Sequence, residues 1–122
     1  IRKQSHSCAF MRPATTSPIV IDEIIRGYIG FDGLLISDDS SMNALSGDLA
    51  ERTRAIVSGG CDMVLHCNGV MEEMRAVLAN TPVLRGKALK RAQKALACLD
   101  KVTDDDEIAM RDAFANHLAA VA

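Results

Sequence analysis

Residues 30–39 read Gly-Phe-Asp-Gly-Leu-Leu-Ile-Ser-Asp-Asp, and this stretch decides the fold of the chain around it. Gly33 to Ser37 is largely apolar, which predicts a short strand that helices cover on both faces, as in a parallel sheet. The polar residues from Asp38 to Ser46 predict a loop after that strand. Because catalytic groups gather at the carboxyl ends of parallel strands, the two adjacent carboxylates are the first candidates for chemistry.

Helical patterns flank this strand. Upstream, Ser17-Pro18 predicts a helix start, followed by one apolar helical face of Ile21, Ile24, Ile25 and Tyr28. Downstream, we expect a helix over 47–58, a second buried strand over 61–67, and helices over 70–79, 84–101 and from Thr103 onward. Strands that alternate with helices indicate βαβ units, so the predicted class is α/β with a parallel pair of strands.

The last two helices have apolar stripes. The helix over 84–101 should turn Leu89, Ala92, Leu96 and Leu99 inward, and the final helix Phe114, Leu118 and Val121. Asp106 stands at the capping-box position that follows Thr103. Two strands are few, because an isolated pair is marginal in water and leaves both edges open. We therefore expect either a very helical small domain or a piece of something larger.

Composition limits the possible partners. The chain has 122 residues, enough for one domain, and a net charge of −2 with no basic stripe. This argues against nucleic acid or an anionic membrane as a partner. No apolar run reaches the roughly 20 residues that span a bilayer, and no apolar signal core follows the basic first residues. A cytoplasmic location is therefore the expectation.

The two aspartates leave several roles open. Adjacent acids after a strand can serve as nucleophile, as base, or as ligands for a metal or a transferred phosphate. The same residue types also solvate loops and cap helices. Strand parity does not say whether Asp38 or Asp39 faces a pocket, because both faces of the predicted strand are apolar.

The segment after the second predicted strand is a weaker candidate. His66 is expected to be a hydrogen-bonded structural residue, and Cys67 should point to the opposite face of the strand. Together with Cys61 they do not supply the ligand spacing of a zinc site, so no metal is expected. The four cysteines, Cys8, Cys61, Cys67 and Cys98, contain no CxxC pair, and we expect buried reduced thiols.

Several motifs together resemble family 3 glycoside hydrolases of the β-N-acetylglucosaminidase type. They are Arg12-Pro13-Ala14-Thr15, the helix over 20–28, the stretch 30–39 with Met42, and residues 59–65 with Cys67-Asn68. The bacterial cytoplasmic enzymes of peptidoglycan recycling are similar in this way. The likeness runs from about residue 12 to residue 100, and the Gly-Phe-Asp-Gly to Ser-Asp-Asp stretch is its most specific part.

The resemblance implies a fold and a site. The fold would be the C-terminal part of a (β/α)8 TIM barrel over 13–102, with its seventh strand at 33–37 and its eighth at 63–67. An atypical lead segment, 1–12, would precede it and a terminal helix, 103–122, would follow. Asp38 would be the nucleophile of a retaining double displacement. Residues implied in substrate binding are Asp39, Met42 and Asn68, and Asp39 would orient the loop or the substrate. No cofactor is implied.

The departures from the family pattern are as informative. In this subgroup a histidine on a mobile loop, supported by an aspartate, supplies acid and base, and a Lys-His motif holds the sugar. Residues 1–12 reproduce neither, and His6 stands at no matching position. A frameshift, a degraded gene or a misplaced start would each produce such a junction. We therefore expect an incomplete hexosaminidase barrel that keeps its nucleophile and is inactive or nearly so alone.

Three hypotheses follow. The whole enzyme would release terminal β-linked N-acetylglucosamine from muropeptide fragments, a small-molecule sugar substrate. Alternatively the chain is a non-catalytic fragment or defunct gene product, which would self-associate through open sheet edges. A phospho-receiver domain fits the length and the acidic pair, but its five strands, further aspartate and late-strand lysine are missing from the pattern.

Overall fold

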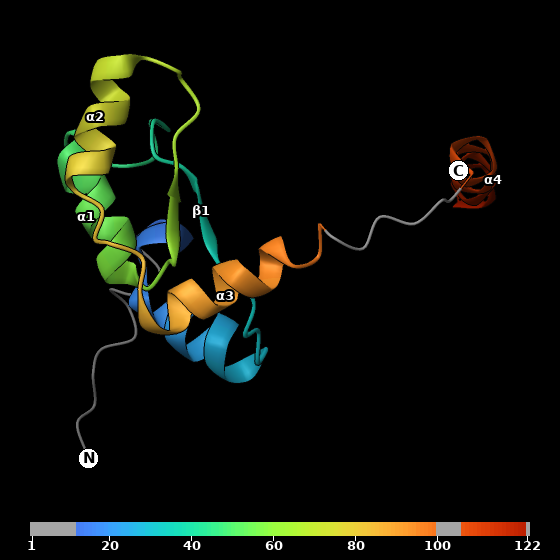
Figure 1. The fold of residues 1–122 in the computed structure, drawn as a ribbon, viewed down its shortest axis with the longest axis horizontal. Helices are drawn as coiled ribbons and strands as arrows, with labels where there is room; N and C mark the ends of the chain where they lie inside the picture. The colour runs from blue at the N-terminus through green and yellow to red at the C-terminus, as the bar shows by residue number, and fades with distance from the viewer. Residues whose placement is uncertain (1–11, 100–105, 122) are drawn as a thin grey trace.

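The computed structural model describes residues 12–99 and 106–121 (Figure 1). The elements are η2 (Ala14–Thr16), η3 (Ile19–Tyr28), β1 (Ile36–Asp39), α1 (Leu49–Gly59), β2 (Met63–Leu65), α2 (Met71–Ala79), α3 (Gly86–Leu96) and α4 (Glu107–Val121). β1 and β2 pair in parallel. This confirms the predicted α/β order of helices and strands, to which the structure adds the short 3-10 turn η2.

The strands differ from the prediction. β1 begins at Ile36, later than the predicted Gly33, and it includes both aspartates that were expected in the following loop. β2 is shorter than the predicted 61–67. The reason is that ladder bonds, rather than apolar character, set strand limits. The Ser40 amide still donates to the Leu65 carbonyl at 2.9 Å, so pairing reaches past the apolar run.

The helix η3 begins as predicted but turns more widely. The Ser17 hydroxyl accepts from the Val20 amide at 3.4 Å, which confirms serine as the cap. η3 is a π-helix, with bonds such as Ile29 N–H to the Ile24 carbonyl at 2.8 Å. The five-residue spacing of these bonds rotates later residues away from the face expected for an α-helix. The predicted inward Tyr28 is therefore wrong, since 90% of it is exposed.

α1 is defined by strong local signals at both ends. Asp48 accepts from the Glu51 amide at 2.8 Å while the Glu51 carboxylate accepts from the Asp48 amide at 3.1 Å, a complete capping box. The helix ends at Gly60, whose φ of 109° suits glycine alone. Gly59 packs against η2 so closely that a Cβ there would lie 3.0 Å from the Thr16 backbone.

The core lies where η3, α1 and the two strands meet. Its buried members are Ile21, Leu45, Ile56 and Cys61, with Ile25, Leu35 and Val64 packed against them. Thr53 is fully buried on α1 and donates its hydroxyl to the Leu49 carbonyl. α1 and α2 lie beside each other, as Figure 1 shows. This small core holds β1 and β2 so that their carboxyl ends lie next to each other.

The C-terminal helices are covered less than predicted. α3 ends at Leu96, and of its predicted inward residues only Ala92 is buried, whereas Leu96 and Leu99 are 62% and 70% exposed. In the part of the chain described, the apolar residues at the end of this stripe, Leu96 and Leu99, are left uncovered. Asp106 caps α4 directly by accepting from the amides of residues 108 and 109, and Thr103 lies outside the described residues.

The predicted inward stripe of α4 is also uncovered. Phe114 and Leu118 are 64% and 52% exposed, and the side chain of Val121 lies outside the described residues. None of the described helices has the length and apolar character to cross a lipid bilayer.

Candidate active site

Asp38 presents a carboxylate at the carboxyl end of β1. The residue is exposed, and its Oδ1 accepts from the Asp39 amide at 2.8 Å. Over residues 12–99 and 106–121, its carboxylate receives no other hydrogen bond and no ion pair. A carboxylate held this lightly keeps its lone pairs available for attack on an electrophilic carbon.

Asp39 has the opposite character, because the chain itself occupies its carboxylate. Oδ1 accepts from the amides of Ser41 at 3.0 Å and Cys67 at 3.2 Å, and Oδ2 accepts from the Ser41 hydroxyl. These bonds, chiefly that of the Ser41 side chain, hold the pKa of Asp39 below its ordinary value. Asp39 therefore orders the loop after β1 and ties it to the chain leaving β2, a distinction that strand parity left open.

Acid should weaken the fold through Asp39. Its folded-state pKa is below the unfolded value of about 3.9, so its contribution is present above that value and is lost as pH falls through the folded pKa. We expect Asp39→Asn to be less stable than wild type at pH 7 and to lose less stability between pH 5 and pH 3. Urea unfolding over this range measures both.

The matched control is Asp38→Asn, which removes the same charge one residue earlier. It leaves the bonds of Asp39 to Ser41 and Cys67 in place, so the wild-type acid sensitivity should remain. Parallel acid profiles for wild type and Asp39→Asn would refute the structural role of this carboxylate.

The loop that follows β1 is wrapped around one arginine from α1. Arg52 donates through NH1 to the carbonyls of Ser40 and Met42 at 3.3 and 3.4 Å, and through Nε to the Gly47 carbonyl at 2.9 Å. Buried or half-buried carbonyls of an irregular loop need such donors. The Met42 side chain remains 41% exposed beside this loop.

Asn68 joins the second segment to the first. Its Oδ1 lies 3.2 Å from the Ser41 hydroxyl oxygen, whose single proton is shared between Asp39 and Asn68, and its Nδ2 donates to Glu73 at 3.0 Å. The structure thus brings Asp39 and Asn68 together through Ser41, although Asn68 itself is exposed.

Three further residues form an arrangement that looks like a hydrolytic triad. The Ser40 hydroxyl lies 3.2 Å from His66 Nδ1, and His66 Nε2 lies 3.1 Å from a Glu73 oxygen, without a hydrogen-bonding angle. Ser40 is 0% exposed, however, so its hydroxyl reaches no substrate. The arrangement is a structural link between the ends of β1 and β2, in agreement with the predicted structural role of His66.

The thiols are only partly as predicted. Cys61 is buried, and burial raises the pKa of its thiol, which suits an inert core residue. Cys67 and Cys98 are exposed, so the prediction of buried thiols is wrong for them, and Cys8 lies outside the described residues. Cys67 is turned outward because its segment has already left the ladder of β2. No group of three potential metal ligands occurs among the described residues.

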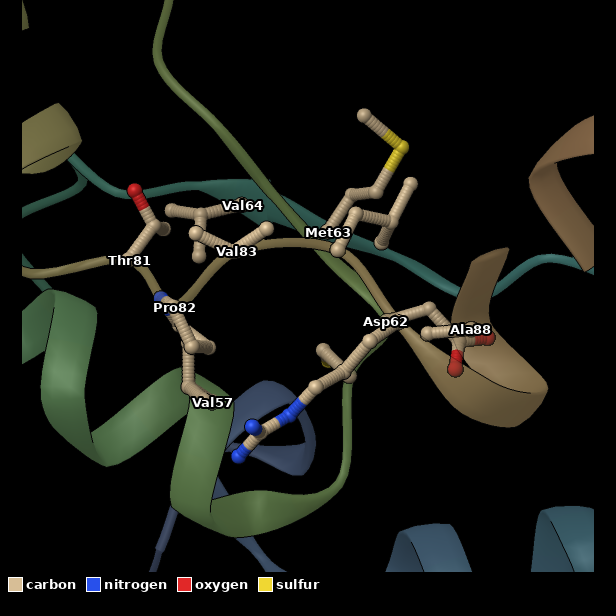
Figure 2. A pocket seen from close by; sticks show the side chains of 11 residues that line it. Val57, Asp62, Met63, Val64, Thr81, Pro82, Val83 and Ala88 are labelled. Atoms are coloured by element: carbon tan, nitrogen blue, oxygen red, sulfur yellow. The ribbon is translucent and has the colours of Figure 1, made fainter.

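Two cavities lie beside the strands, and Cys61 lines both. One of about 200 Å³ has Asp38 in its wall, together with the apolar Ala14, Ile21, Ile25, Leu35, Ile36 and Cys61, and Thr15. Another, of about 230 Å³, lies where β2 begins, and Figure 2 shows Val57, Pro82 and Val83 around it with Asp62. The Asp62 carboxylate already binds Arg26 and Arg91. Of the two acids beside these cavities, Asp38 alone has a carboxylate without an ion pair among the described residues, so the candidate site is placed at Asp38.

Comparison with known proteins identifies the family of the chain. Residues 4–98 match the glycosyl hydrolase family 3 N-terminal domain. The chain belongs to glycoside hydrolase family 3. The match covers most of the chain, including both strands and therefore Asp38 and Asp39 on β1.

Curated relatives of this family 3 chain are named β-hexosaminidase. The protein of Bordetella avium is 48% identical over 59 residues, which are 47% of this chain and 17% of the relative. That of Alkalilimnicola ehrlichii is 46% identical over 72 residues, 57% and 20% of the two chains. That of Chromobacterium violaceum is 33% identical over 112 residues, 90% and 31%. The chain therefore spans less than a third of the length of these relatives.

Sequence reasoning missed several residues that shape the candidate site. Ser37 and Ser41 bond to the two aspartates, and Arg52 bonds to the loop that follows them, yet none was singled out. A signal existed for Ser37, because a serine inside an apolar strand must find a hydrogen-bond partner. Arg52 carried no such signal, since an arginine on a half-exposed helix is ordinary.

Proposed function

We propose that this chain supplies the nucleophile of a retaining β-N-acetylglucosaminidase that acts on peptidoglycan fragments. One observation carries the proposal. Of the two adjacent acids in the family motif, Asp38 is exposed and lightly held, whereas the carboxylate of Asp39 is occupied by the loop. A nucleophile must reach its substrate, so Asp38 takes this role and Asp39 positions the loop that surrounds it.

The chemistry is a double displacement. Asp38 attacks the anomeric carbon of a terminal N-acetylglucosamine, the aglycone leaves with a proton from a general acid, and a glycosyl-enzyme forms. Water then attacks the same carbon, the carboxylate leaves, and the configuration is retained. Met42 and Asn68 stand exposed at the same end of the sheet and contact the bound sugar in this proposal.

The structural frame of the proposal is a barrel. β1 and β2 correspond to the seventh and eighth strands, and residues 13–102 to the last βα units, with 1–12 as a lead segment and 103–122 as a terminal helix. The support is that Ile36, Met63 and Leu65 on the two strands are 41–49% exposed. Apolar strand residues are covered in a closed barrel, so in this proposal further strands cover these side chains.

Alone, the chain should release no chromophore from a chromogenic N-acetylglucosaminide. General acid catalysis contributes about 10² to 10⁴-fold, and His66 at this end of the sheet has a side chain that is only 6% exposed. The measurement is the release of chromophore by the purified chain at high concentration, with buffer alone and the Asp38→Ala variant as controls. Turnover that Asp38→Ala abolishes would show that the chain already holds a complete site.

A non-catalytic fragment is the second candidate, and the same exposed strand residues favour it. The open edges of the parallel pair, with Ile36, Met63 and Leu65 uncovered, would promote self-association of the chain. Self-association is a physical property and implies no catalytic reaction. The phospho-receiver alternative gains no support, because residues 12–99 and 106–121 hold two strands where five are needed.

A further inference from the structure

The pairing of β1 with β2 is irregular between Ile36 and Asp39, the part of the strand that contains Asp38. Ile36 stands opposite Met63, but Asp39 stands opposite Leu65, so β1 advances by one residue more than β2 between the two pairs. Such a β-bulge bends a strand and re-aims a side chain, and bulges are frequent beside active sites. Ser37 and Asp38 are the two residues inside this bulge.

The hydroxyl of Ser37 holds the bulge together. Ser37 is 6% exposed, and its Oγ accepts from the Leu65 amide at 2.9 Å while donating to the Asp38 carbonyl at 2.7 Å. The side chain therefore takes the ladder position that a backbone carbonyl would fill in a regular pair. An apolar residue here would leave the partly buried Leu65 amide without this partner, and the loss of this hydrogen bond favours a change of pairing.

A change of pairing would matter because side-chain direction alternates along a strand. In a regular ladder Asp38, not Asp39, would stand opposite Leu65, and a slip of one residue turns each side chain to the other face. The bonds from Asp39 to Ser41 and Cys67 would be disturbed by the same slip. The bulge thus separates the free carboxylate from the loop-bound one.

We propose that Ser37 is a positioning residue for Asp38, because its hydroxyl holds the bulge that aims the Asp38 carboxylate away from β2. The proposal rests on the assignment of Asp38 as nucleophile and adds the residue that orients it. Ser37 does not touch the sugar and transfers no proton. It acts through the backbone carbonyl of Asp38 and the amide of Leu65.

The test is a matched pair of substitutions, Ser37→Thr and Ser37→Val, which differ in the hydroxyl at nearly constant shape. Amide hydrogen exchange of Leu65 is measured relative to Ile56, which reports the core. In the valine variant we expect Leu65 to exchange about five- to tenfold faster relative to Ile56, the effect of one lost hydrogen bond. The threonine variant should stay within about twofold of wild type, since it keeps the hydroxyl.

A second readout reports the aim of Asp38 itself. Three-bond couplings that define its χ1 angle should indicate one dominant rotamer in wild type and Ser37→Thr, and averaging in Ser37→Val. Unchanged Leu65 exchange, or an unchanged Asp38 rotamer in the valine variant, would overturn the proposal. If Ser37→Val does not fold, Ser37→Ala takes its place; if neither folds while Ser37→Thr does, the hydroxyl serves the fold rather than the aim, and the proposal also fails.

These measurements use no sugar and no turnover. If Asp38 proves not to be a nucleophile, the proposed function fails while the exchange and coupling results stand. If the couplings are insensitive to the hydroxyl, the positioning role fails while Asp38 can still be the nucleophile. The two failures are therefore distinguishable.

Discussion

Asp38→Asn should abolish turnover in a chimera in which residues 12–98 of this chain replace the matching stretch of the Chromobacterium violaceum β-hexosaminidase. That relative aligns over 90% of this chain, so the junctions fall at equivalent positions. The rest of the relative supplies whatever the site needs outside this segment. Loss of the nucleophile removes the covalent route, and we expect a fall in kcat on the order of 10⁴-fold or more.

The measurement is kcat on a chromogenic N-acetylglucosaminide, with mass spectrometry to locate a trapped glycosyl group. The unsubstituted chimera should carry the sugar on Asp38. Asp39→Asn is the matched control, since it removes the neighbouring charge and loosens the loop while leaving the nucleophile, and its fall in kcat should be much smaller. Full activity of the Asp38→Asn chimera, or a sugar found on Asp39, would refute the assignment.

The largest effect on stability is expected at Asp62, at the opposite end of the sheet. Its side chain is 6% exposed and accepts from Arg26 at 2.7 Å, from the Leu35 amide at 2.9 Å and from Arg91 at 3.0 Å. Arg26 in turn donates to the carbonyls of Phe31 and Gly33 at 2.8 and 2.7 Å. One carboxylate therefore joins η3, α3 and the start of β2 to the Gly-Phe-Asp-Gly turn.

Asp62→Ala should lower the free energy of unfolding by about 3–5 kcal/mol, because it leaves two arginines and a backbone amide without their shared acceptor. The total free energy of unfolding of a small domain is only about 5–15 kcal/mol, so most of the cooperative unfolding transition should be lost. Thermal and urea unfolding followed by circular dichroism measure the change.

Asp32→Ala is the matched control. Asp32 also pairs with Arg91, at 2.6 Å, but its side chain is 87% exposed. Water competes for such a pair, so its loss should change the unfolding free energy little, although Arg91 lowers the pKa of Asp32. Equal losses from the two substitutions would contradict a special role for the buried carboxylate.

Much of the fold could be predicted from sequence because its signals are local. The cap at Ser17 and the stop at Gly60 depend on a few neighbouring residues, and both stand as predicted. The order of helices and strands follows from periodicity, which also needs only nearby residues. The family match covers residues 4–98, which include the motif around Asp38.

The predictions that failed depend on partners far along the chain. The inward faces assigned to Leu96 and Leu99 assumed a covering surface that periodicity cannot supply. The limits of β1 were wrong because they follow from hydrogen bonds to β2 rather than from apolar character.

The candidate site shows the same division. Sequence by itself determined that two adjacent acids follow an apolar strand, because this depends only on residue order and on the motif. Only the tertiary structure decided which acid is free. Asp39 is held by the amide of Cys67, and the bulge that contains Asp38 is held by the amide of Leu65, both on the neighbouring segment. The roles of two chemically identical side chains thus depend on contacts between segments that meet only after folding.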